Sequence, residues 1–75
     1  MPTEQQQTSV SNTYYDLVSV LYHALEASQT YASYIRDAQA SGNQQLVQFF
    51  QQVQQEDNNR AQRAQQLLTQ LSQRS

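Results

Sequence analysis

A single glycine, Gly42, separates two long stretches of helix-forming sequence, and this feature most constrains how the chain can fold. The stretches 13–41 and 43–74 contain neither glycine nor proline, and in each of them apolar residues return at alternating steps of four and three. This spacing places apolar side chains along one side of a helix. Glycine readily takes the left-handed conformation that ends a helix, and Asn43 is a favourable N-cap for the next one. The sequence therefore predicts an all-α fold: an antiparallel hairpin with helices at 13–41 and 43–74 and a turn near 42.

The segment 1–12 differs from the rest of the chain. It is polar, contains Pro2 and a run of three glutamines, and has no apolar periodicity, so we predict a disordered N-terminal arm. Thr13 and Asp16 then form a Thr-x-x-Asp pattern, in which the threonine can cap a helix and the carboxylate can complement its positive end. The helical hairpin is expected to occupy 13–75.

The length of the chain favours an assembly. Seventy-five residues without cysteine rarely supply a self-sufficient core, and no disulfide is available. Both predicted helices are roughly 40 to 48 Å long, and their apolar faces are broader than a two-stranded seam. We therefore predict a homodimer in which two hairpins close a four-helix bundle. The residues predicted for the dimer core are Val18, Leu21, Leu25, Ile35, Leu46, Phe50, Val53, Ala64, Leu67 and Leu71.

Charge and hydropathy argue against two classes of partner. The net charge is −2, with four Arg and no Lys, so there is no basic patch suited to nucleic acid. No apolar run approaches the ~20 residues that a membrane span requires, and no apolar leader is evident. We expect a cytoplasmic protein that binds neither nucleic acid nor membranes.

Two charged residues, Asp57 and Arg60, interrupt the apolar seam of the second predicted helix. They are one turn apart, and because an unpaired buried charge costs several kcal/mol, we expect them to pair. In a hairpin that turns near Gly42, Ser28 lies level with Asp57, and Tyr31 is close enough in height to offer its hydroxyl. The sequence predicts a polar core layer of Ser28, Tyr31, Asp57 and Arg60.

A family resemblance follows from positions counted outward from the turn. The residues that carry it are Tyr31, Ala38, Leu46, Phe50, Asp57 and Arg60, over about Leu17 to Leu71. In this pattern the chain resembles a ferritin-like, rubrerythrin-like helix pair, which is half of a four-helix bundle. The resemblance implies a Glu on the first helix and a Glu-x-x-His on the second, which together hold metal ions.

The ligand positions implied by this resemblance are occupied by Ala24, Asp57 and Arg60. A guanidinium has no lone pair to give to a metal and stays charged. The resemblance thus implies a ferritin-like bundle that has lost its metal site and needs no cofactor. An alternative is a displaced iron or manganese site that uses His23, Glu26, Glu56 or Asp57, because His23-x-x-Glu26 has ligand spacing on a helix.

Two functions remain open from the sequence. No nucleophile and histidine share a face and there is no glycine-rich phosphate loop, so we expect no enzyme activity. The favoured function is a non-catalytic, ferritin-like homodimeric bundle that acts as an interaction or assembly module. The alternative is a ferritin-like metalloprotein with a redox or iron-handling role. Tyr15, Tyr22 and Tyr34 leave the main stripe and either cover the bundle or form a docking face for another protein.

Overall fold

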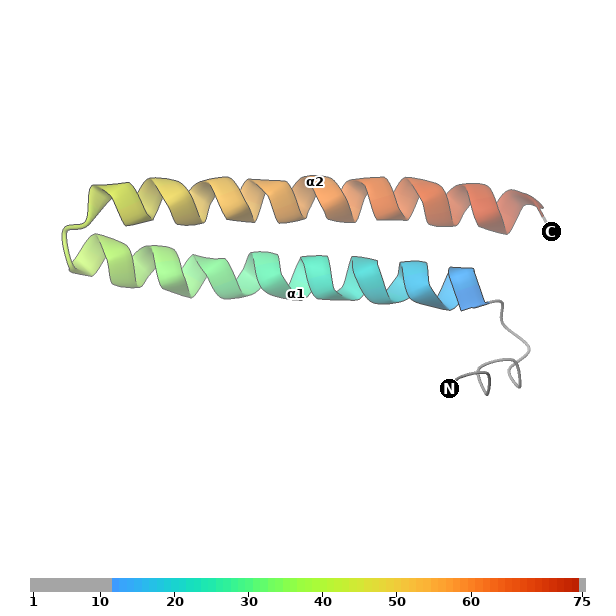
Figure 1. The fold of residues 1–75 in the computed structure, drawn as a ribbon, viewed down its shortest axis with the longest axis horizontal. Coiled ribbons are helices and arrows are strands. Elements are labelled where there is room, and N and C mark those ends of the chain that lie inside the picture. Colours follow the sequence, from blue (N-terminus) through green and yellow to red (C-terminus); the bar gives the residue numbers. More distant parts are fainter. Residues whose placement is uncertain (1–11, 75) are drawn as a thin grey trace.

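The computed structural model describes residues 12–74, and these form two antiparallel helices that lie side by side along their whole length (Figure 1). Helix α1 spans Asn12–Ala40 and helix α2 spans Gln44–Arg74. The predicted all-α helical hairpin is confirmed, and the described residues contain no sheet. The N-terminal arm predicted for 1–12 lies outside the described residues, except that Asn12 is the first residue of α1.

The turn between the helices has a regular capping geometry. Gly42 has a φ of 72°, and its N–H donates to the carbonyl of Gln39, while the N–H of Asn43 donates to the carbonyl of Ala38. This pair of bonds is the Schellman arrangement that closes a helix on a left-handed residue. The side-chain oxygen of Asn43 then accepts a 3.1 Å hydrogen bond from the N–H of Leu46, as an N-cap does. One glycine and one asparagine therefore reverse the chain within three residues.

The start of α1 differs from its predicted position by one residue. The helix begins at Asn12, so Thr13 lies inside it, and no acidic residue stands in its first turn. Asp16 is the fifth residue of the helix and is too far along to complement the positive end as predicted. A Thr-x-x-Asp pattern locates a helix start only to within a residue or two, which accounts for the difference.

The contact between the helices is built from small side chains. The buried apolar residues are Ala24 and Ala38 of α1 and Val47, Ala61 and Ala64 of α2. Alanine lets two helix backbones approach closely but removes little apolar area from water. Among the residues that the structure describes, no large side chain is fully buried. A single hairpin therefore leaves most of its large apolar side chains at least partly exposed.

Neither of the two described helices carries an apolar stretch long enough to cross a membrane.

Candidate interaction surface

One side of the hairpin carries large apolar residues from both helices. We call it the apolar face, and it consists of Val20, Tyr34, Leu46, Phe49 and Leu67, of which only Leu67 is as much as half-buried. Val20 and Tyr34 are two heptads apart on α1, and Phe49 and Leu67 are five helical turns apart on α2, so each pair shares a side of its helix. Val20 borders the same hollow as Leu67, and Tyr34 the same hollow as Leu46. The two helices therefore present one continuous surface.

Near the turn the apolar face is aromatic. The ring of Phe50 lies 5.7 Å from that of Tyr34 and 5.8 Å from that of Phe49, while Tyr31 stacks edge-on to Tyr34 at 5.3 Å. These separations are typical of favourable aromatic pairs. Phe49 nevertheless keeps 55% of its surface exposed, because it stands at the outer border of the cluster. It is the largest apolar projection on this face of α2.

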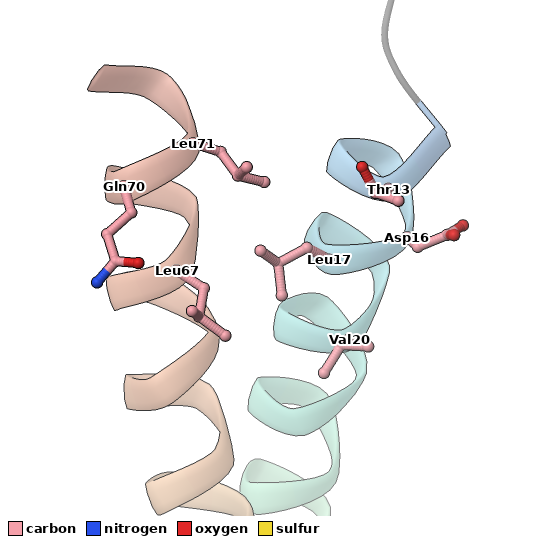
Figure 2. Close-up of a pocket in the computed structure, with 7 residues that line it drawn as sticks. All are labelled: Thr13, Asp16, Leu17, Val20, Leu67, Gln70 and Leu71. Atoms are coloured by element: carbon pink, nitrogen blue, oxygen red, sulfur yellow. The ribbon is translucent and has the colours of Figure 1, made fainter. Parts of the chain in front are cut away.

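At the open end of the hairpin the apolar face is hollow. Figure 2 shows Leu17 of α1 and Leu67 and Leu71 of α2 pointing into the space between the helices, with Val20 below them. Asp16 and Gln70 stand at the border of this hollow and point away from it. The hollow is open to solvent and has a volume of about 400 Å³, and most of its lining surface is apolar. A projection near the turn and a hollow at the far end thus lie on one face.

The opposite edge of the hairpin is closed by polar contacts. The hydroxyl of Ser28 donates a 2.8 Å hydrogen bond to the side-chain oxygen of Asn58, and the side-chain amide of Gln54 donates a 2.8 Å bond to the carbonyl of Ser28. Asn58 follows Phe49 by nine residues, which is half a turn around the helix at about 100° per residue. These hydrogen bonds therefore join the two helices on the side of the hairpin that faces away from the apolar face.

A second set of apolar residues lies on α1 alone. We call it the outer stripe, and it consists of Tyr15, Val18, Tyr22 and Leu25, all of them exposed. Tyr22 precedes Tyr34 by twelve residues, which turns it about 120° away from the apolar face. The outer stripe therefore does not belong to the same surface.

The two charges of the α2 seam form an ion pair. A guanidinium nitrogen of Arg60 donates to a carboxylate oxygen of Asp57. Asp57 is 8% exposed and belongs to the buried residues, whereas the Arg60 side chain is 53% exposed. The pair thus runs from the helix contact outward, and it places a positive charge on the side of α2 that carries Phe49 and Leu67.

The other two members of the predicted polar layer lie elsewhere. Ser28 bonds to Asn58 and Gln54 rather than to Asp57, and Tyr31 packs its ring on Tyr34 and Phe50. No hydrogen bond between Tyr31 and Asp57 occurs among the described residues. The four residues therefore belong to three separate groups: an ion pair, a polar edge and an aromatic cluster. Residues at the same height along two antiparallel helices can point to different sides of the hairpin.

The residues of the alternative metal site are not brought together. Nδ1 of His23 lies 3.3 Å from the hydroxyl oxygen of Ser19 one turn earlier, and the His23 ring is edge-on to Tyr22. Glu56 accepts a hydrogen bond from the side-chain amide of Gln52. Glu26 is exposed on α1, and Asp57 faces Arg60 on α2. Across residues 12–74, no three His, Cys, Asp or Glu side chains form a group that suits a metal ion. The displaced iron or manganese site is therefore not assembled in this part of the chain.

The residues predicted for the dimer core differ in how far the hairpin exposes them. Val18, Leu25 and Leu46 are exposed on the hairpin; Leu21, Ile35, Phe50, Val53, Leu67 and Leu71 are partly exposed, and Ala64 is buried. Val47 and Ala61 were not singled out, although both are buried in the helix contact. Their signal was a second periodic row on α2, namely Val47, Ala61 and Leu68, beside the predicted seam. Phe49 was also left outside the core list, although it is the main apolar projection.

Comparison with known proteins corrects the predicted resemblance. Residues 14–73 match the family model described as "Phosphoinositide-specific phospholipase C, efhand-like". The ferritin-like, rubrerythrin-like assignment is therefore wrong, since the match covers 60 of the 75 residues and points to another family. The wrong assignment rested on apolar and charged residues at helical spacing, which does not distinguish one pair of amphipathic helices from another. No curated protein and no solved structure gives a significant match.

The chain departs from a calcium-binding EF-hand at the connection between its helices. An EF-hand loop has twelve residues, with oxygen ligands at alternating positions and a bidentate glutamate at the end. Here only Ser41, Gly42 and Asn43 lie between α1 and α2, and none of them is acidic. The side-chain oxygen of Asn43 is already used to cap α2. These residues do not fit a calcium ion. Because the family model matches residues 14–73, the chain belongs to the EF-hand-like family of phosphoinositide-specific phospholipase C, and a short capped turn joins its two helices.

Proposed function

We propose that this chain is a non-catalytic assembly module that works as a homodimer, in which a second copy covers the apolar face and the two hairpins form a four-helix bundle. The observation that carries the proposal is the contrast between the two sides of the hairpin. The edge at Ser28 and Asn58 is satisfied by hydrogen bonds, whereas Phe49 and its neighbours on the other side meet water.

The size of the exposed side chains supports this proposal. A single hairpin buries four alanines and one valine, while each large apolar side chain removed from water contributes about 1.5 to 3 kcal/mol. Part of this contribution is still unused on the apolar face, where Val20, Tyr34, Leu46 and Phe49 keep 41 to 55% of their surface exposed, and it is realised only when a partner covers them. A second copy brings an equally apolar surface of the same length.

The chemistry of the described residues supports a role without catalysis. The family description names the EF-hand-like part of a phospholipase. The sequence has one histidine, His23, and it lies on the exposed side of α1 beside Tyr22 rather than in a hollow. The hollow at the open end is lined by leucine and valine with Thr13, Asp16 and Gln70 at its border, which gives no pair of acid and base groups facing each other.

The proposal is tested by coupling stability to concentration. The full chain is unfolded with urea at two protein concentrations that differ a hundredfold, and helicity is followed by circular dichroism. If folding depends on a second copy, the dimer gains about 2.7 kcal/mol of stability between the two concentrations, which is about 1.4 kcal/mol per chain, and the urea midpoint rises. An unchanged midpoint with a helical chain at both concentrations would show that the hairpin is stable alone and would remove the need for a partner.

A further inference from the structure

The positions of the apolar seam of α2 have the same spacing when they are counted from either end of the helix. Its residues are Leu46, Phe50, Val53, Asp57, Arg60, Ala64, Leu67 and Leu71. The steps between them alternate four and three, and the whole set is symmetric about a point between Asn58 and Asn59. This point lies at the middle of α2, which runs from Gln44 to Arg74. An antiparallel copy of α2 placed on a two-fold axis at this point therefore meets the same set of positions.

The types of residue at these positions complement one another under that symmetry. Position 57 is paired with position 60 of the second copy, so the acidic Asp57 meets a basic Arg60 twice. The projecting Phe49 and Leu46 near the turn are carried over the apolar hollow near Leu67 and Leu71 at the open end. Charge and shape thus agree on one register.

We infer that the two copies pack with their turns at opposite ends, α2 against α2, and that Asp57 and Arg60 select this arrangement by forming ion pairs across the two-fold axis. The inference rests on the proposed homodimer and adds its orientation and register. Arg60 already leads from Asp57 toward the apolar face, and with its side chain 53% exposed it can reach a second carboxylate. Asp57 keeps its own Arg60 while it accepts from the other chain.

The competing arrangement has both turns at the same end. In it, each α2 packs on α1 of the other copy, and the middle of α2 then faces the middle of α1 near the half-buried Ala27. The ion pair would be covered by alanine and would receive no second charge, which is costly for a buried ionic group. Aromatic residues near the turns would also meet each other while the two hollows faced each other. The charges and the shapes of the two surfaces therefore both favour the arrangement with the turns at opposite ends.

Charge variants test the role of the two residues. Asp57→Arg makes both positions basic and Arg60→Asp makes both acidic, so each variant alone brings like charges together at the axis and is expected to weaken its own dimer at least tenfold. An equimolar mixture of the two restores opposite charges between the chains, and the heterodimer is expected to form with an affinity within about threefold of the unchanged chain. A mixture that associates no better than the separate variants would overturn the pairing across the axis.

Spin-label distances test the orientation independently. The chain has no cysteine, so Gln44→Cys places one label beside the turn, and Gln62→Cys places a matched label five helical turns further along, near the middle of α2. With turns at opposite ends, the two labels at position 44 are separated by about 44 Å along the rod, and those at position 62 by only about 10 Å along it. With turns at the same end, the two labels of each variant lie at the same height along the rod, so both variants give similar distances, which are set by the width of the bundle.

A long distance for Gln44→Cys together with a short one for Gln62→Cys supports the inference. Similar distances for both variants would overturn it and leave the homodimer intact. No distance for either variant, with the mass of one chain, would overturn the homodimer and the inference together. The two failures are therefore distinguishable in one experiment.

Discussion

Arg60 donates a hydrogen bond to the carboxylate of Asp57 one turn earlier on α2, although the two side chains lie in very different surroundings. Asp57 is buried in the helix contact, and Arg60 extends to the apolar face. The carboxylate therefore holds the guanidinium in place, and the hairpin presents a fixed charge at the middle of an otherwise apolar surface. A surface of this kind selects the register of its partner as well as attracting one.

Replacing the main apolar projection is expected to weaken the proposed dimer. Phe49→Ser removes an aromatic ring from the apolar face of each copy, and each ring is worth about 1.5 to 3 kcal/mol when it is covered. We expect the dissociation constant to rise at least tenfold, measured by sedimentation at a series of concentrations. The helices themselves should form as before at high concentration, because the buried contact does not include Phe49.

The outer stripe supplies a matched control. Tyr22→Ser removes an aromatic ring of similar exposure, 61% against 55% for Phe49, from a different side of α1. We expect its dissociation constant to stay within about twofold of the unchanged chain. If Tyr22→Ser weakens association as much as Phe49→Ser does, the second copy is seated on the outer stripe and the apolar face is wrongly chosen.

A side chain at the turn glycine destabilises the hairpin through the backbone. Gly42 has a φ of 72°, and a Cβ there would meet no atom within 4 Å, so the effect of Gly42→Ala is conformational rather than steric. We expect a loss of about 1 to 2 kcal/mol in the free energy of unfolding, measured by urea titration. Gly42→Asn should lose less, because asparagine tolerates the left-handed region better. Equal losses for both would argue against this cause.

The alanines between the helices set the distance between α1 and α2. Ala24 is 4% exposed, so Ala24→Leu forces extra methyl groups into a filled contact and is expected to cost about 1 to 3 kcal/mol of folding stability. Ala40→Leu, at the exposed end of α1, should change the stability by less than about 0.5 kcal/mol. Thermal unfolding of both variants gives the comparison. If Ala24→Leu left the stability unchanged, the two helices would have to lie further apart than a filled alanine contact allows.

Calcium should have no effect on the chain. The turn offers no acidic ligand, and one of its few oxygens already caps α2. We expect an unchanged melting temperature when calcium is added to millimolar concentration, with magnesium as the control ion. A saturable rise in the melting temperature with calcium alone would show that the chain binds calcium through residues other than those of the turn.

The sequence was sufficient for the hairpin and its turn because these depend on local signals. Gly42 and Asn43 act through backbone conformation and capping, and the four-three spacing marks helices whatever they pack against. The pairing of Asp57 with Arg60 was likewise predictable, since residues one turn apart on a helix are neighbours.

The rest could not be predicted from one sequence for a geometric reason. Which side of each helix faces the other depends on a rotation about the helix axis, and two adjacent apolar rows on α2 made the choice ambiguous. Val47 and Ala61 therefore share the contact with Asp57 and Ala64 of the predicted seam, while Leu46 of the same seam is exposed. Ser28 was placed at the right height but on the wrong side for Asp57, and it bonds to Asn58 instead. The family was missed because helical spacing alone does not distinguish one hairpin family from another.

Sedimentation equilibrium on the full chain tests the central claim most directly, since it measures mass without reference to shape. A self-associating hairpin gives twice the 8.6 kDa of one chain at micromolar concentration and falls toward one chain on dilution, and Phe49→Ser moves that transition to higher concentration. A mass of one chain throughout, with helicity retained, would contradict the claim that a second copy covers the apolar face.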